Sequence, residues 1–282
     1  MSTLSSTLAE RFPDMTPSQR RIARHVFHQV NHVLVATQAQ LAEQVGVSEA
    51  TVSRFMHTLG FSRFKDFKDA LTKEAFAEFS TTRRLVDSSD RLQGTVMSSV
   101  LSTDIANIRE ILSTQSDEHF EQAVQSLAQA RNVYVLGLRS SYTLAFYLYF
   151  TLRFFSSNVR LLRPDVGDMP EQILDIGADD VLVGISFRRY TQLTIDLTKK
   201  IKKKGTTVVA ITDSMLSPLA HLADITMLTA TSMPSFFESY TAPMSLINAL
   251  MAALALSRED QAIYALDLME STLEDFETYF QD

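Results

Sequence analysis

The sequence predicts an α/β protein of two domains. Residues 1–77 form an all-helical helix-turn-helix domain, and residues 93–282 form an α/β domain with a five-stranded parallel sheet flanked by helices. Three observations predict this class. Residues 41–59 have the spacing of two short helices joined by a tight turn. Residues 78–92 lack periodicity and are rich in Ser and Thr, which is typical of an inter-domain linker. From residue 131, short β-branched runs alternate with longer helical stretches.

The first long helix of the N-terminal domain is expected from about Pro17 to Gln29. Thr16 suits its N-cap, and Pro17 suits its first turn because the missing N–H has no intrahelical partner there. Helical spacing predicts that its buried side chains are Ile22, Ala23, Val26 and Phe27. A last helix of this domain is expected to be anchored by Phe61, Phe64, Phe67 and Leu71.

Two shorter helices between these form the helix-turn-helix pattern. The first, Gln38 to Val45, is expected to bury Leu41, Ala42 and Val45. Gly46 supplies the left-handed residue that commonly ends a helix, and Ser48 is a natural N-cap for the next one. The second helix is expected to turn inward the side chains of Val52, Phe55, Met56 and Leu59.

The outward face of the second short helix indicates DNA binding. Its short hydrogen-bonding side chains and one arginine can read base edges in a major groove, and flanking cations can contact phosphates. Residues 1–77 carry nine Lys/Arg against seven Asp/Glu, whereas the whole chain has a net charge of −7. The candidate DNA-binding residues are Arg20, Ser48, Glu49, Thr51, Ser53, Arg54, His57, Arg63 and Lys65. The alternative is structural, because two helices joined by a glycine turn also occur in folds that never touch DNA.

Composition excludes several classes of protein. The 282 residues contain no cysteine, so disulfides, thiolate catalysis and Cys-based metal sites are excluded. The N-terminus lacks the features of a signal peptide, and the longest apolar stretch, Tyr142–Phe155, is too short to span a bilayer. We therefore expect a cytoplasmic protein without membrane contact. We also expect that it has no catalytic group, cofactor or metal. His25, His28 and His32 share a helical face, but without a carboxylate partner they are more typical of solvated or DNA-facing histidines than of a metal site.

The second domain begins with helical spacing over residues 93–130 and continues as alternating strands and helices. Strands are expected at 133–136, 159–162, 180–185, 207–211 and 225–228. Helices are expected at 140–155, 191–203 and 239–257. An acidic helix from Glu259 carries Ile263, Leu266, Leu273, Phe276 and Phe280 on one side, which is expected to pack on a partner or on its own domain. Such sheets bind ligands at the carboxyl ends of their strands.

Two loops that directly follow predicted strands indicate an anion site. Residues 137–141 and 186–191 each offer hydroxyls, an arginine and backbone amides at a helix N-terminus, which suit a phosphate above all. The candidate effector-binding residues are Arg139, Ser140, Ser141, Ser186, Arg188, Arg189, Thr191 and Glu238. The alternative is that Ser140 and Thr191 only cap their helices. Asp213 lies at the same edge and is interpreted as a turn residue.

The chain resembles the RpiR/MurR family of bacterial transcription regulators. The resemblance rests on LAEQVGVSEATVSRFMHTLGFSRFKDFK, VYVLGLRSS, DDVLVGISFRRYTQLT, GTTVVAITDSMLSPLAHLADITM and FFESYTAPMSLINALMAALAL. It implies an N-terminal helix-turn-helix domain, a C-terminal SIS (sugar isomerase) domain, and a homodimer or homotetramer. It also implies binding to a double-stranded DNA operator and control by a small anionic effector, typically a phosphosugar. Three residues depart from the usual SIS loops: Arg139 and Arg189 replace glycines and Arg188 replaces a serine. These arginines can clamp an anion, fill part of the site or face solvent.

Three functions follow from these observations. The first is a transcriptional regulator, for instance a repressor of carbohydrate metabolism, whose operator binding responds to the effector. The second is a phosphosugar isomerase with a helical appendage, for which Glu238 and His221 offer a general base. The usual role of a carboxylate at Glu238 is to favour a helix N-terminus. The third is an oligomeric sensor that has lost its effector site.

Overall fold

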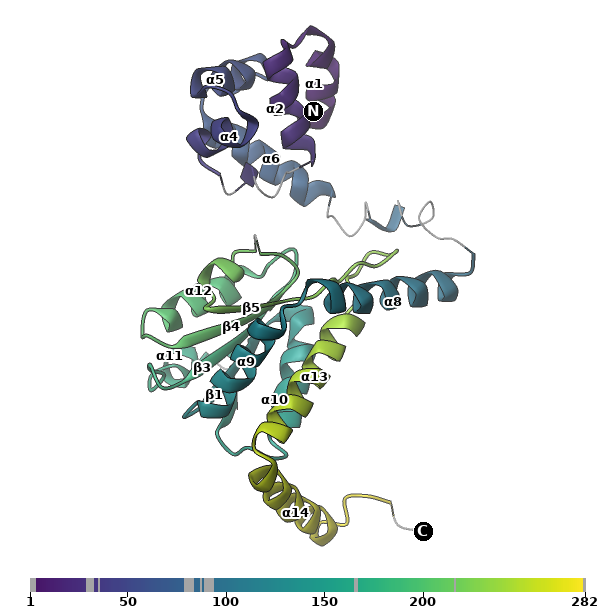
Figure 1. The fold of residues 1–282 in the computed structure, drawn as a ribbon, viewed down its shortest axis with the longest axis vertical. Helices are drawn as coiled ribbons and strands as arrows, with labels where there is room; N and C mark the ends of the chain where they lie inside the picture. Colours follow the sequence, from purple (N-terminus) through teal and green to yellow (C-terminus); the bar gives the residue numbers. More distant parts are fainter. Residues whose placement is uncertain are drawn as a thin grey trace. The chain divides into compact units, whose positions relative to one another are not determined.

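The computed structural model consists of two compact units, residues 1–91 and 92–282 (Figure 1). It describes residues 4–28, 33–34, 36–78, 84–86, 88, 94–164, 167–215 and 217–280. Most of the expected linker, 78–92, lies outside these residues, as do His32 and the side chain of His28.

The N-terminal unit is all-helical within its described residues. Its elements are α1 (Leu4–Arg11), a 3₁₀ turn (Phe12–Asp14), α2 (Pro17–His28), α4 (Gln38–Val45), α5 (Glu49–Thr58) and α6 (Phe64–Glu78). Their apolar faces meet in one core. Phe67 of α6 packs edge-on against Phe55 of α5, with ring centroids 6.1 Å apart. The expected inward residues Val52, Phe55 and Met56 are buried, which confirms the predicted amphipathic face of α5.

Local capping explains where these helices begin and end. Thr16 and Gln19 form reciprocal side chain–backbone hydrogen bonds at the start of α2, and Thr37 does the same with Gln40 at the start of α4. Gly46 ends α4 with φ at 68°, a left-handed conformation that favours glycine. Ser48 then accepts a hydrogen bond from the Thr51 N–H and caps α5. The predicted capping roles of Thr16, Gly46 and Ser48 are therefore confirmed.

The second unit is built on a five-stranded sheet of order β2-β1-β3-β4-β5, in which every neighbouring pair is parallel. The strands are β1 (Val133–Gly137), β2 (Val159–Leu161), β3 (Val181–Ile185), β4 (Thr207–Thr212) and β5 (Ile225–Leu228). The helices are α8 (Val96–Thr114), α9 (Asp117–Gln129), α10 (Tyr142–Leu152), α11 (Met169–Gln172), α12 (Gln192–Lys202), α13 (Thr241–Ser257) and α14 (Glu259–Asp275). The predicted α/β class with five parallel strands is confirmed.

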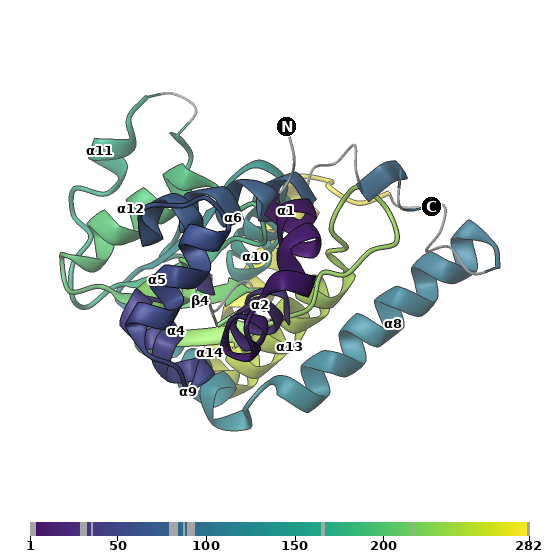
Figure 2. The same cartoon turned by 90° about the horizontal axis from the view of Figure 1, so that it is seen from above.

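Helices cover both faces of the sheet, as Figures 1 and 2 show. Alternate residues of each strand point to opposite faces, so Val133 and Val135 join the core beneath α9, α10 and α13. Tyr134 and Leu136 join a second core with Leu197 of α12. Both faces of β1 and β3 are therefore buried, which explains why the sequences of these two strands are continuous apolar runs. No helix in the described part of the chain is long and apolar enough to cross a membrane.

The helix expected over 140–155 is shorter in the structure. The chain first makes a 3₁₀ turn at Arg139–Ser141, with Arg139 in a left-handed conformation, so the regular helix α10 begins only at Tyr142. The expected packing of the C-terminal helix on its own domain is also incomplete. Ile263, Phe276 and Phe280 are 52%, 79% and 92% exposed, so most of the apolar side of this segment is uncovered within one chain.

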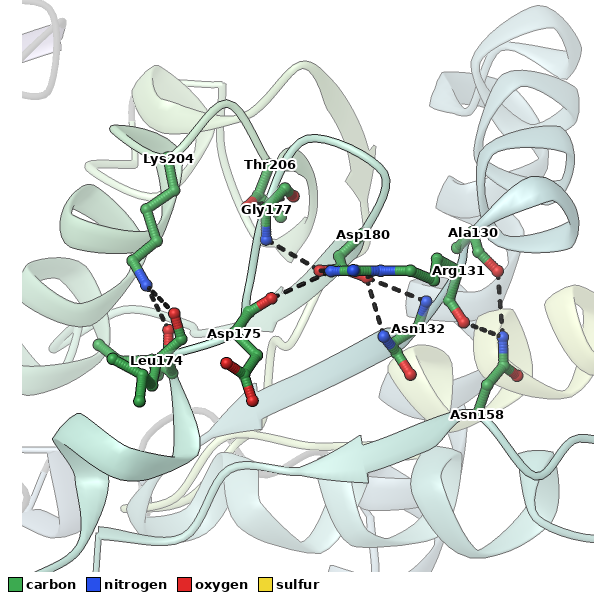
Figure 3. A network of polar contacts seen from close by, with 11 residues as sticks. Ala130, Arg131, Asn132, Asn158, Leu174, Asp175, Gly177, Asp180, Lys204 and Thr206 are labelled. Carbon is green, nitrogen blue, oxygen red and sulfur yellow. Dashed lines mark hydrogen bonds and ion pairs between the residues drawn. The ribbon is translucent and has the colours of Figure 1, made fainter.

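A polar network holds the amino ends of β1 and β3 together (Figure 3). The Asp180 carboxylate is fully buried and accepts hydrogen bonds from the Arg131 guanidinium, at 2.9 and 2.6 Å, and from the Gly177 and Asn132 N–H groups. Burial alone would raise the pKa of Asp180, but these donors outweigh it and hold the pKa at about 2. Asn158 extends the network by donating to the Ala130 and Arg131 carbonyls.

We expect Asp180→Asn to lower the free energy of unfolding of the second unit by about 2–4 kcal/mol, because it leaves a partly paired guanidinium and a poorer acceptor. In the wild type, the contribution from this carboxylate, about 2 kcal/mol, is fully present above its unfolded pKa. It is lost as the pH falls through about 2. Urea unfolding followed by tyrosine fluorescence reports this unit alone, since all eight tyrosines lie beyond residue 91. The control is Asp175→Asn at an exposed carboxylate nearby; equal midpoints for the two variants would contradict the prediction.

Candidate functional site

The exposed side of α5 carries a connected row of polar side chains. The Ser48 and Thr51 hydroxyls lie 2.9 Å apart, and the Arg54 guanidinium donates to the Thr51 hydroxyl at 3.3 Å. These three residues are spaced three apart, so they line one face of the helix. Glu49 and His57 are also exposed. The row begins at the helix N-terminus, which is the end of a recognition helix that contacts bases in helix-turn-helix proteins.

A glutamine that the sequence analysis did not single out fixes α5 against α4. The Gln38 amide donates to the Ser53 hydroxyl at 2.9 Å and to the Glu49 carbonyl at 3.2 Å. Gln19 of α2 donates in the same way to Thr58 at 3.0 Å, and Thr58 donates to the Arg54 carbonyl. The candidate Ser53 is thus tied into the helix-turn-helix scaffold. Its partner was not predictable, because Gln38 lies fifteen residues away in sequence.

The three cationic candidates outside α5 lie in different surroundings. The Arg20 guanidinium lies over the Phe12 ring, 5.7 Å from its centroid, and donates to the Pro13 carbonyl at 2.8 Å. Arg20 therefore stabilises the turn between α1 and α2. Arg63 makes a bidentate ion pair with the Asp66 carboxylate, at 2.6 and 2.9 Å. Lys65 is exposed. An exposed pair of this kind contributes little to stability, so Arg63 can be released to a phosphate at small cost.

The histidines do not assemble a metal site among the described residues. His25 of α2 lies 3.3 Å from the Gln44 amide oxygen. No three His, Asp or Glu side chains within the described ranges come together as ligands. His32 and the side chain of His28 lie outside those ranges.

The two loops of the second unit emerge side by side. β1 and β3 are parallel neighbours, and Gly137 pairs with Ile185 at their carboxyl ends. The segments that follow, 138–141 and 186–191, therefore start at the same edge of the sheet. β4 ends one strand further along, where Ile211 pairs with Ile185, and places Asp213 at this edge as well.

Both loops hold an arginine in the left-handed conformation. Arg139 has φ at 56° and Arg189 at 66°, and both side chains are exposed. These are two of the positions at which the resemblance described above implies glycine. The backbone shape of a glycine is therefore retained with a charged side chain attached, at a cost of about 1–2 kcal/mol per residue. Such strain at a strand end is typical of a functional loop.

The first loop packs tightly against α10. A Cβ atom at Gly137 would lie 2.7 Å from the Ser141 carbonyl oxygen and 2.9 Å from the Ala145 Cβ, so this position requires glycine. Ser141 is buried beneath the loop, whereas Ser140 is exposed. The Ser140 hydroxyl accepts a hydrogen bond from the Tyr240 hydroxyl at 2.8 Å.

A largely buried acid that directly follows β4, Asp213, engages the arginine of the second loop. Arg188 Nε lies 3.6 Å from an Asp213 carboxylate oxygen, and the Tyr190 hydroxyl donates to the other oxygen at 2.9 Å. Burial raises the pKa of both Asp213 and Tyr190. Ser186 is buried, and its carbonyl accepts from the Thr212 hydroxyl at 2.7 Å. Asp213 therefore does more than form a turn, because it orients Arg188 and Tyr190.

The capping interpretation of these loops is wrong. Ser140 lies within the 3₁₀ turn before α10, and its hydroxyl is bound to Tyr240. Thr191 precedes α12, but within the described residues its side chain makes no capping hydrogen bond. Both hydroxyls therefore remain candidates for a ligand.

Tyr240, which the sequence analysis missed, lies between the two loops. Its hydroxyl contacts Ser140, and its ring lies 5.4 Å from that of Phe187 in the second loop. It immediately precedes α13, about one hundred residues after Ser140, so no local pattern indicates this role. Glu238 lies two residues earlier and is half-buried.

Two family models match this chain. Residues 3–78 match the helix-turn-helix domain of the rpiR family, and residues 126–253 match the SIS domain. The first match contains α5 and its polar row, and the second contains both loops and Tyr240.

Curated relatives match over most of their length. An uncharacterized HTH-type transcriptional regulator of Haemophilus influenzae is 27% identical over 227 residues, 76% of this chain and 75% of that protein. The HTH-type transcriptional regulator HexR of Pseudomonas aeruginosa is 23% identical over 226 residues, 80% of this chain and 78% of HexR.

Two solved structures share the fold. The Vibrio vulnificus NanR protein, complexed with ManNAc-6P, has a TM-score of 0.67 and 18% identity, and the match covers 97% of this chain and 99% of that chain. The sugar isomerase domain of an RpiR transcription factor from Sphaerobacter thermophilus has a TM-score of 0.59 and 24% identity, with coverage of 63% and 99%.

Replacing either left-handed arginine by glycine is expected to stabilise the second unit. Arg139→Gly and Arg189→Gly remove the steric cost of a left-handed side chain, so each should exceed the matched alanine variant by up to about 1 kcal/mol in free energy of unfolding. The alanine variants remove the same charge but keep the strain. Urea unfolding followed by tyrosine fluorescence measures the difference; glycine variants less stable than their alanine partners would show that the loops are not strained at these residues.

Proposed function

Because this chain belongs to the RpiR family of transcriptional regulators with a helix-turn-helix and a SIS domain, we propose that a small anionic effector controls its binding to an operator. The effector is a phosphosugar or a related acidic metabolite. It binds at the carboxyl edge of the sheet, between residues 138–141 and 186–191. Residues 1–77 bind the DNA, residues 93–282 bind the effector and assemble the oligomer, and 78–92 link them.

The observation that carries the effector site is the pair of neighbouring loops with left-handed arginines. Arg139, Arg188 and Arg189 bring three positive charges to one edge, and Asp213 balances one of them. Exposed Ser140 adds a hydroxyl donor, and the start of α12 adds backbone N–H groups with a favourable dipole. Guanidinium groups and helix N-termini both prefer phosphate or carboxylate oxygens. NanR, which shares this fold, was solved with ManNAc-6P, which supports the phosphosugar class.

For the DNA-reading half, the polar row on α5 supports base contacts. Thr51 and Arg54 are held in contact at 3.3 Å on an exposed helix face, while Gln38 and Gln19 fix the helix from behind. Arg63 and Lys65, both exposed, contact phosphates in this proposal. Arg20 supports the scaffold and is the weakest of the nine candidates.

A second copy of the chain is the proposed partner of the apolar side of α8. Met97, Leu101, Ile105 and Leu112 lie on one helical face and are 71%, 53%, 50% and 84% exposed. A contiguous apolar stripe of this kind marks an interaction surface. Helix-turn-helix proteins read two half-sites as dimers, so a homo-oligomer also fits the proposed DNA binding.

The enzyme alternative rests on Glu238, and the structure adds little to it. An isomerase needs a base within hydrogen-bond reach of the substrate carbon. His221, the other candidate base, is an exposed residue of the 3₁₀ turn Ala220–Leu222 that follows β4. The two relatives described above, from Haemophilus influenzae and Pseudomonas aeruginosa, are named as HTH-type transcriptional regulators. We therefore propose that the chain binds its phosphosugar without converting it.

Arg54→Ala and Thr51→Ala are each expected to weaken operator binding roughly tenfold, because each removes a base-contacting group. The measurement is fluorescence anisotropy at fixed salt with a DNA fragment that the wild-type chain selects from random sequence. Lys203→Ala, which removes an exposed charge from the second unit, is the control and should bind as the wild type does. A wild-type chain that selects no sequence would refute the DNA-reading role.

Ser140→Ala is expected to weaken effector binding roughly five- to tenfold, because it removes one hydrogen bond to the anion. The measurement is the thermal shift produced by ManNAc-6P and by glucose 6-phosphate, titrated separately. Ser113→Ala on α8 is the matched control. If neither compound, nor a sugar acid, raises the melting temperature of the wild type, we infer that the arginines close the site. The chain is then better described as an oligomeric sensor that has lost its effector site.

Leu101→Glu with Ile105→Glu is expected to reduce the molar mass in solution to that of one chain, 31.7 kDa. The charges would be buried without partners if a second copy covered this face. Light scattering after size-exclusion chromatography measures the mass. A wild type that already elutes as a single chain would contradict the proposed oligomer.

A further inference from the structure

Three consecutive residues before and at the start of α13 touch both effector loops and α8. Tyr240 contacts Ser140 through its hydroxyl at 2.8 Å and Phe187 through its ring at 5.4 Å. On either side of it, the Ser239 and Thr241 hydroxyls donate to the two oxygens of the Asp104 carboxylate, the latter at 2.9 Å. The two loops and α8 therefore meet on one short segment.

α8 and the residue that follows it also contact the segment from the end of β5 to residue 239 at two points. The buried Asn107 amide donates to the Ser232 carbonyl at 2.8 Å, and the Gln115 side chain accepts from the Leu228 N–H at 3.1 Å. Asp104 and Asn107 are three residues apart, so they share a face of the helix. α8 also packs along α13 (Figure 2). A shift of residues 239–241 is therefore transmitted directly to α8.

The position of α8 in the chain gives this contact a consequence. It begins at Val96, close to the boundary between the two units at residues 91 and 92. Among the described residues, α8 is thus the first long helix of the second unit.

The Ser140 hydroxyl can respond to a ligand through its remaining hydrogen. It accepts from Tyr240 and can donate to an anion at the same time, and two hydrogen bonds in such a chain strengthen each other. An anion beside Ser140 therefore tightens the contact to Tyr240 and favours one placement of residues 239–241.

Resting on the proposed function, we propose that Tyr240 and Asp104 are positioning residues that pass effector occupancy from the two loops to α8. Tyr240 moves with the two loops because it contacts both of them. Asp104 links α8 to Ser239 and Thr241, so a shift of these two residues changes the position of α8. The physical requirement is a differential contact in the bound and free states, which the shared Ser140 hydroxyl supplies.

The first test needs no effector. Amide hydrogen exchange is measured by mass spectrometry on the full-length wild type, Asp104→Asn and the control Glu110→Gln, which removes the same charge from an exposed position of α8. Asp104→Asn is expected to speed exchange roughly fivefold in residues 138–143, beyond its own contacts, and Glu110→Gln is not. Tyr240→Phe, which keeps the ring, should speed exchange in the first half of α8. Unchanged exchange in 138–143 for Asp104→Asn would overturn the proposal.

The second test separates binding from response. Asp104→Asn is expected to keep the thermal shift with ManNAc-6P or glucose 6-phosphate, while the ratio of operator dissociation constants with and without that compound falls to within about twofold of one. Ser239→Ala with Thr241→Val is a second route to the same loss if Asp104→Asn folds poorly. A variant that binds the compound and responds as the wild type does would overturn the proposal. If the wild type binds neither compound, the proposed effector class is wrong. The hydrogen-exchange experiment alone then tests the positioning roles of Tyr240 and Asp104.

Discussion

The parallel, in-register pairing of β1 with β3 is the constraint on which the rest of the second unit depends. It places Gly137 beside Ile185, so the two loops that follow must leave the sheet at neighbouring points. Tyr240 can contact both loops only because they lie together. Burial of both strand faces under helices fixes this register, since a slip by one residue would exchange the two cores.

The two edges of the sheet are stabilised in opposite ways. At the amino edge, the buried Asp180 carboxylate has a full set of donors, which makes that edge a rigid base (Figure 3). At the carboxyl edge, Arg139 and Arg189 keep left-handed backbones, and hydroxyls on exposed residues remain accessible. Strain at one edge is tolerated because the other edge and the cores over-determine the fold.

Sequence reasoning recovered the elements well because their signals are local. All five strands were predicted to within two residues from β-branched runs, and the capping roles of Thr16, Gly46 and Ser48 follow from short spacings. It also identified both loops and their arginines. It missed Gln38, Tyr240 and Asp104 as functional neighbours, since each meets its partner only through tertiary structure. For Asp104 and Thr241 the separation is 137 residues. The hydrogen bond from Arg20 to the Pro13 carbonyl depends in the same way on the conformation of the turn between α1 and α2.

The left-handed arginines also bear on how ligand preference diverges between related proteins. A backbone that already adopts the glycine conformation accepts glycine at Arg139 or Arg189 without any rearrangement of the sheet. Charge can therefore be lost or regained at the loop by one substitution, on an unchanged scaffold. At the proposed effector site, descendants of a common ancestor can thus gain or lose charge without passing through a misfolded intermediate.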